Sequence, residues 1–255
     1  AQLITKGNGP GEMFSCALGL HSNASDNFYL QDPNSKTCYI VDLKTLLNSR
    51  KFVPDEQFRY SSEVLPTSDL CLLDDNRYIG YHMWYLDDKQ FSKVDSPLGY
   101  YQKGEDSGKG MDDFPFFVAS VNGARLFKNP QTQELWTADM HRDAIRIYND
   151  SLKQIRELVG PDHFSPEYTR RQIDAPVAFV TFADECDYHA YTDYYITDKH
   201  IYLVYEGNKH FDMKNLSPVE IFKLDFDGNL LCNYKLDRYV YSISINKKED
   251  TLYCA

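Results

Sequence analysis

Short stretches in which apolar and polar residues alternate make up most of this 255-residue chain, and turns rich in Asp, Asn, Gly and Pro separate them. Alternation with a period of two is typical of half-buried β-strands, and amphipathic helices with a period of 3.6 residues are hard to find here. Hairpins are predicted over 27–43, 134–152 and 200–230, and a less regular one over 77–94. The pattern therefore predicts an all-β protein.

These hairpins belong to a repeated unit of four short strands. A strand-like segment precedes each one (CALGLHS, DLCLLDD, ARLFKNP, TDYYITD and SISINKK), and another follows two of them (LKQIREL and LLCNYKL). The second strands begin at Phe28, Tyr78, Leu135, Ile201 and Leu252, which are 50 to 66 residues apart. Such units are typical of β-propeller blades, and longer intervals indicate inserted loops. A β-sandwich, the main alternative, would not need the same unit five times.

The two ends of the chain bear on the number of blades. The final unit, DTLYCA, stops after its second strand, and AQLITKG is a strand with no partner upstream. In a propeller, a terminal strand usually completes the blade at the opposite end of the chain. We therefore predict a single β-propeller domain over residues 1–255, with four-stranded antiparallel blades. We expect six blades, part of a terminal one lying outside these residues, and five blades are the alternative.

Composition and charge narrow the classes of partner. The chain has 20 Tyr and 15 Phe, which favours sheet, and a net charge of −11. A negative field repels phosphate, so we expect neither nucleic acid nor anionic lipid as a partner. No run approaches the ~20 apolar residues of a membrane helix. The chain begins at Ala1 without a basic and apolar leader, so we expect a mature or trimmed form.

Six cysteines are scattered without any CxxC pair, at positions Cys16, Cys38, Cys71, Cys186, Cys232 and Cys254. Zinc knuckles and thioredoxin-type redox sites both require that close spacing. We expect no metal or other cofactor and predict buried free thiols, because several of these cysteines lie in strand-like contexts. Disulfides remain open if the protein is exported.

The glycine-rich stretch KGNGPGEMF (6–14) lacks the Lys-Ser/Thr that a phosphate-binding loop needs. We interpret it as a turn whose glycines permit positive φ and close backbone approach, with Glu12 as an acceptor for the amides of the turn.

KGNGPGE and the propeller-type repeat together resemble the TolB-like six-bladed β-propeller proteins of the bacterial envelope, many of which carry a G-x-GPGE element. YIVDLKTLL (39–47) is similar to the strand and turn that follow this element, and YSISINKKEDTLYCA (241–255) is similar to the family's ending. The resemblance implies a six-bladed fold and an exported protein, often lipid-anchored, of the periplasm or outer membrane. It implies no catalytic residue, because members are mostly of unassigned function. The blade expected upstream of the glycine element is absent.

Several polar clusters are candidate ligand contacts. FADECDYHAY places carboxylates beside an imidazole, which could bind a divalent metal or act as an acid/base pair, although a solvated loop would look the same. Its candidates are Asp184, Glu185, Asp187 and His189. GYHMWYL could stack on a planar ligand but more often packs between blades, and ADMHRDA usually forms a solvent-facing turn. These two segments supply His82, Trp84, His141 and Arg142.

The stretch from about Gly160 to Val180 is long for a connection without structure, so we expect it to be functional, for example as a short helix that caps the propeller. Arg170 and Arg171 within it could meet a carboxylate ligand or form surface ion pairs.

No G-x-S-x-G motif occurs, which excludes a common serine hydrolase. We predict a monomeric, non-enzymatic module of the bacterial envelope that binds a protein or glycan near Asp184 and Arg171, with membrane contact only through a lipid anchor outside this chain. The alternative is a carboxylate-dependent glycan hydrolase or lyase at the propeller channel that uses His189 or His82.

Overall fold

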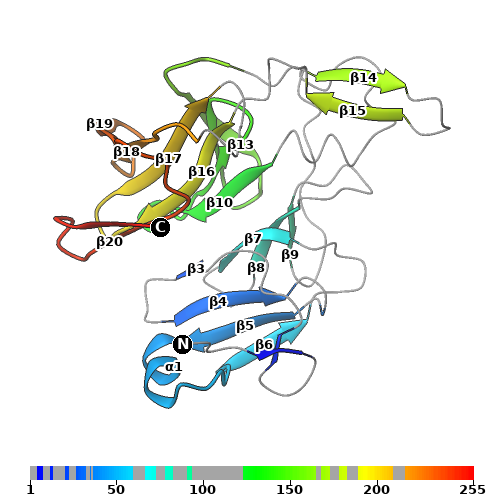
Figure 1. Ribbon diagram of the computed structural model, residues 1–255, viewed down its shortest axis with the longest axis vertical. Helices are drawn as coiled ribbons and strands as arrows, with labels where there is room; N and C mark the ends of the chain where they lie inside the picture. Colours follow the sequence, from blue (N-terminus) through cyan, green and yellow to red (C-terminus); the bar gives the residue numbers. More distant parts are fainter. Residues whose placement is uncertain are drawn as a thin grey trace. The chain divides into compact units, whose positions relative to one another are not determined.

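A computed structural model of the chain shows β-sheets in both halves (Figure 1). It describes residues 5–7, 12–13, 21–22, 27–32, 35, 37–59, 67–72, 78–82, 91–93, 123–164, 168–172, 178–182, 189–208 and 216–255. The chain divides into two compact units, Ala1–Tyr101 and Gln102–Ala255. We describe each unit by itself.

The C-terminal unit contains two four-stranded antiparallel sheets, each in plain chain order. The first comprises β10 (Ala124–Lys128), β11 (Leu135–Asp139), β12 (Ala144–Tyr148) and β13 (Gln154–Val159). The second comprises β16 (His189–Ile196), β17 (Ile201–Asn208), β18 (Glu220–Leu224) and β19 (Leu230–Lys235). Two pairs complete the unit: β14 (Tyr168–Gln172) with β15 (Ala178–Phe182), and β20 (Ile243–Ile245) with β21 (Leu252–Cys254).

An apolar core lies between the two four-stranded sheets. Trp136 is fully buried between its cross-strand partners Phe127 and Ile147, and this row packs with Leu203 and Phe222 of the second sheet. Since side chains alternate along a strand, every second residue of β11 and β17 points into this core. Burying these large side chains supplies the main stabilisation that holds sheet against sheet.

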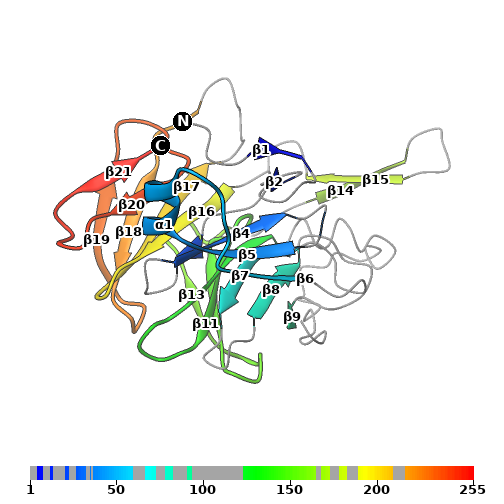
Figure 2. The same cartoon turned by 90° about the horizontal axis from the view of Figure 1, so that it is seen from below.

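The opposite face of the second sheet is also covered. Tyr202 and Val204 of β17 form a second apolar cluster with Ile243 and Ile245 of β20. β20 lies beside β16 in both views (Figures 1 and 2). β17 is therefore buried on both faces, which explains why its sequence is a nearly continuous apolar run.

The N-terminal unit contains a four-stranded and a three-stranded antiparallel sheet and one parallel pair. The first sheet comprises β3 (His21–Ser22), β4 (Asn27–Asp32), β5 (Thr37–Asp42) and β6 (Glu56–Arg59), and the second comprises β7 (Thr67–Leu72), β8 (Tyr78–His82) and β9 (Phe91–Lys93). β1 (Thr5–Lys6) pairs in parallel with β2 (Glu12–Met13). Helix α1 (Leu43–Ser49) follows β5 directly.

The predicted all-β fold with antiparallel four-stranded sheets is confirmed. The five predicted second strands are β4, β8, β11, β17 and β21, and each is second in its sheet. The predictions of one domain and of six blades stay predictions.

Two local expectations are wrong. Residues 43–49 form a helix where a turn was expected, because the Asp42 carboxylate accepts a hydrogen bond from the backbone N–H of Thr45 at 2.6 Å and caps the helix. That hydrogen bond also lowers the pKa of Asp42. Tyr168–Gln172 is a strand paired with β15, where a short helix was considered.

In the glycine-rich stretch, the backbone N–H of Gly7 donates to the carbonyl of Met13 at 3.1 Å. A Cβ atom at Gly7 would lie 2.1 Å from Oε2 of Glu12. This position needs glycine because the Glu12 carboxylate lies against its backbone.

The described cysteine side chains are free thiols: Cys38 is buried, Cys232 is half-buried and Cys254 is exposed. The prediction of burial is therefore right for Cys38 and wrong for Cys254. Cys16, Cys186 and the side chain of Cys71 lie outside the described residues. In the described part of the chain, no helix is long and apolar enough to cross a membrane.

Candidate functional site

One end of the two sheets of the C-terminal unit gathers polar side chains from segments far apart in the sequence. The turn between β11 and β12 lies beside the start of β16, because the backbone N–H of Ala190 donates to the carbonyl of Met140 at 2.8 Å. β17 runs antiparallel to β16 and pairs His189 with Asn208, so it ends where β16 begins. His141, His189 and Glu206 consequently come together at this end.

The two imidazoles form the exposed part of this cluster. The rings of His141 and His189 meet edge to face, with centroids 5.3 Å apart. Nδ1 of His189 lies 3.9 Å from Oε2 of Glu206, which is too far for a hydrogen bond. The side chain of His189 retains 16% of its exposure, whereas that of Glu206 retains 1%.

The Glu206 carboxylate is only half satisfied. Its Oε1 accepts a hydrogen bond from the Tyr239 hydroxyl at 2.7 Å, and its Oε2 is buried without a hydrogen-bond partner. Leaving a buried polar atom unpaired costs about 1–3 kcal/mol, so such an atom calls for an explanation. Burial and the bond to Glu206 raise the pKa of Tyr239, which keeps its hydroxyl protonated and donating.

An aromatic pair borders the carboxylate. The Tyr239 ring meets that of Tyr241 edge to face at 4.8 Å, and Tyr241 is 61% exposed. Glu206 itself follows Tyr202 and Val204 on the face of β17 that packs against β20. The carboxylate therefore lies between an apolar cluster and an exposed aromatic ring.

Buried charges support the turn that carries His141. Arg142 is 3% exposed, and its Nη1 lies 3.3 Å from Oδ2 of Asp139. Arg146 approaches the same oxygen at 2.8 Å and also pairs with Glu157 at 3.1 Å. Arg142 thus lies within the protein, unlike the solvent-facing turn that the sequence suggested.

Asp143, the next residue, anchors the segment that leaves β13. Its Oδ2 accepts the backbone N–H groups of Asp162 and His163 at 2.6 and 2.9 Å, and its Oδ1 accepts the Tyr191 hydroxyl at 3.1 Å. Burial and the adjacent Asp143 raise the pKa of Tyr191. These contacts tie the root of the long 165–188 stretch to the same end of the sheets as the histidines.

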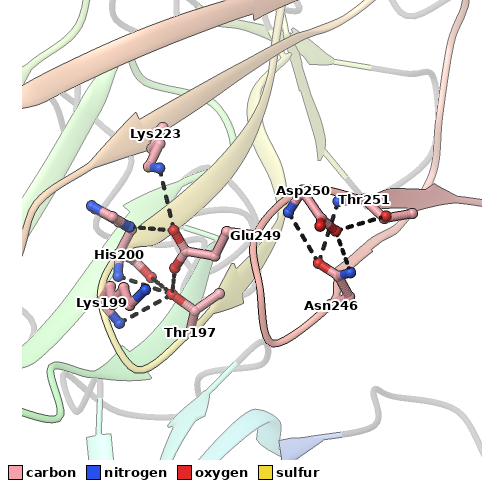
Figure 3. Close-up of polar contacts among 8 residues, drawn as sticks. All are labelled: Thr197, Lys199, His200, Lys223, Asn246, Glu249, Asp250 and Thr251. Carbon is pink, nitrogen blue, oxygen red and sulfur yellow. Dashed lines mark hydrogen bonds and ion pairs between the residues drawn. The ribbon is translucent and has the colours of Figure 1, made fainter.

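A second polar cluster lies at the turn between β20 and β21 (Figure 3). The Glu249 carboxylate accepts hydrogen bonds from the Thr197 hydroxyl, from Nδ1 of His200 at 2.6 Å and from Nζ of Lys223 at 3.3 Å. Burial raises the pKa of Glu249, but these three donors outweigh it and lower the pKa to about 2. Both carboxylate oxygens are satisfied, so we interpret this cluster as a structural clasp.

The other residues predicted from the sequence are not brought into the cluster of His141 and His189. Arg170 and Arg171 lie on β14 and His82 lies on β8, but their side chains lie outside the described residues. Trp84, Asp184, Glu185 and Asp187 also lie outside the described residues.

Sequence reasoning missed Glu206 and Tyr239. A signal existed for Glu206, since it is the one charged residue in IYLVYEGN, an otherwise apolar strand. Within the described ranges, no group of three or more His, Cys, Asp or Glu side chains has the arrangement of a metal site.

These sheets, each in chain order, define a propeller-like repeat protein. Residues 1–248 match the model of the TolB-like 6-blade propeller-like family, and the chain belongs to this family. The resemblance inferred from the glycine-rich element is therefore confirmed. No curated protein matches the sequence.

Solved structures share the fold at low sequence identity. A member of the DUF4221 family from Bacteroides vulgatus is 10% identical, with a TM-score of 0.58, and the match covers 98% of this chain and 75% of that one. A provisionally assigned exported protein from Bacteroides fragilis is 14% identical, with a TM-score of 0.44 and coverage of 92% and 62%. A streptogramin B lyase is 9% identical, with a TM-score of 0.45 and coverage of 92% and 74%.

Proposed function

We propose that this protein is a non-enzymatic binding module whose ligand contacts His141, His189 and Glu206. One observation carries the proposal: Oε2 of Glu206 is buried without a partner beside two partly exposed imidazoles. A folded protein rarely leaves a buried carboxylate oxygen unpaired unless the group has a role besides stability. A bound ligand that donates a hydrogen bond would supply the missing partner.

The surroundings support recognition of a surface group on a protein or glycan. Tyr241 offers an exposed ring on which a sugar or an aliphatic chain can pack, and imidazoles can donate or accept hydrogen bonds. The stretch that holds Asp184 and Arg171 begins at the same end of the sheets, at the segment that Asp143 anchors. We propose that this stretch contributes to the same binding face.

We also propose that the protein is exported, as the family resemblance implies, and that it acts in the periplasm or at the outer membrane. The negative net charge fits a partner that is neutral or cationic.

Binding to a glycan array and capture of envelope proteins test the proposed function. We expect the wild type to bind, and the double variant His141→Gln, His189→Gln to bind at least about 10-fold more weakly. His163→Asn is the matched control: it removes an exposed imidazole outside the cluster, and Asn tolerates the positive φ of 54° at this position. Equal binding by the double variant and the control would contradict the assigned site.

A second candidate function rests on the same geometry. An imidazole beside a buried carboxylate is the arrangement of a general base and the group that orients it, which favours the alternative of a glycan hydrolase or lyase. Turnover of a glycan that Glu206→Gln abolishes, while glycan binding persists, would support the enzyme over the binding module.

A further inference from the structure

We infer that the ligand of this site presents a protonated amine to Oε2 of Glu206. The inference rests on the proposed function and names the chemical class of the group that the site selects.

The first argument is the need of the carboxylate for a donor. Tyr239 donates to Oε1 only, and Nδ1 of His189 stands 3.9 Å from Oε2. A carboxylate oxygen accepts hydrogen bonds and donates none when ionised, so its complement must be an N–H or O–H group. A ligand carboxylate or phosphate would instead face a like charge.

The second argument is the balance of charge around the site. In the part of the chain that the structure describes, no Lys or Arg side chain forms an ion pair with Glu206. Arg142 is the nearest arginine in the sequence to His141, and it pairs with Asp139. A cationic ligand group would therefore supply the countercharge that the protein does not.

The third argument is the apolar and aromatic frame. Glu206 continues the face of Tyr202 and Val204, where the low local dielectric strengthens a hydrogen bond between opposite charges. The exposed Tyr241 ring beside Tyr239 suits the carbon skeleton next to an ammonium group, because the face of an aromatic ring attracts cations. The entry to Oε2 lies past His189, the partly exposed neighbour of the carboxylate.

Calorimetric titration with matched pairs of small probes tests the inference. Glucosamine and N-acetylglucosamine differ in the charge of one nitrogen, and ethanolamine and ethylene glycol form a second such pair. We expect the wild type to bind each amine at least about 10-fold more tightly than its neutral counterpart, because charge-assisted hydrogen bonds are the strong ones. The affinity for the amines should fall as ionic strength rises.

Glu206→Gln keeps the shape of the side chain and removes the charge, so it should weaken binding of the amines by about 10-fold to 100-fold. Asp227→Asn is the control, because it removes an exposed carboxylate in the turn between β18 and β19, at the opposite end of the sheet. Asp227→Asn should bind as the wild type does. If Glu206→Gln does not fold, Tyr239→Phe replaces it: this variant releases Oε1 as a second acceptor and should bind the amines at least as tightly as the wild type.

The outcomes separate the two proposals. Equal affinity for the members of each pair, or amine binding that survives Glu206→Gln, overturns the inference. So does a loss of amine binding in Tyr239→Phe. Binding of neutral glycans alone, lost in the double histidine variant, overturns the inference and leaves the proposed function standing. Absence of binding to all probes, the glycan array and envelope proteins overturns both.

Discussion

Replacement of Glu249 by Gln should release the turn between β20 and β21 from the second sheet. In the native protein its carboxylate receives three donors: Thr197 and His200 beside the turn between β16 and β17, and Lys223 of β18 (Figure 3). Gln retains one carbonyl oxygen and has no charge, so the interactions with His200 and Lys223 weaken. The hydrogen bonds that hold this end of β20 and β21 should weaken with them.

The magnitude follows from the pKa of Glu249, which is lowered from 4.5 to about 2. One pKa unit corresponds to about 1.4 kcal/mol, so the shift corresponds to about 3 kcal/mol. The side chains of Lys223 and His200 are 18% and 21% exposed, and solvent screening reduces their contribution. We expect Glu249→Gln to lower the free energy of unfolding by about 2 kcal/mol at pH 7.

The lowered pKa also fixes the sign of the pH dependence. A carboxylate whose pKa is lower in the folded than in the unfolded state stabilises the fold fully above its unfolded pKa, near 4.5. This contribution is lost as the pH falls toward about 2, the folded pKa. The difference between wild type and Glu249→Gln should therefore be constant between pH 7 and 5 and shrink below that.

Urea unfolding at a series of pH values measures this difference, and hydrogen exchange of residues 243–254 localises it. Asp227→Asn, with the same change of charge at an exposed site, should leave the free energy of unfolding unchanged. The reasoning is refuted if Glu249→Gln unfolds like Asp227→Asn at pH 7. A difference between Glu249→Gln and wild type that persists undiminished at pH 2.5 would also contradict it.

Three further predictions concern the sheets beneath the candidate site. Tyr191→Phe removes the hydroxyl that donates to Asp143 at 3.1 Å and should cost about 1 kcal/mol in urea unfolding; an unchanged midpoint would show that this bond contributes nothing. Gly160→Ala should destabilise more than Tyr191→Phe, since its Cβ would lie 1.8 Å from Oδ1 of Asp143; faster hydrogen exchange at 160–164 would confirm it. Leu203→Ala empties a fully buried position between the two sheets and should cost about 2–5 kcal/mol in urea; a loss below 1 kcal/mol would contradict the packing described here.

Much of the fold could be predicted because strand signals are local. The alternating pattern located the second strand of five sheets, and the Asp-Gly pair of DFDGN forms the predicted turn, with Gly228 at a φ of 85°. The helix at 43–49 was missed because LKTLLNS is too short to show a helical period. Its start depends on a single cap, the side chain of Asp42.

The candidate site could be predicted only in part. His141 and His189 stood out by residue type, but nothing in the sequence indicates that their rings meet. Arg142 and Asp143 resemble a polar turn, and only the packing of Asp139, Arg146 and the 160–164 segment buries them.

The sequence by itself determined the strand-and-turn repeat, the family and the need for glycine at position 7, because pleating and turn geometry depend on residues close together in the chain. Tertiary structure alone decided that His141, His189 and Glu206 share one end of the sheets, and that Glu206 keeps one oxygen unpaired. Burial and electrostatic pairing depend on which distant segments pack together. That packing is set by the contacts of the whole sheet rather than by any short stretch of residues.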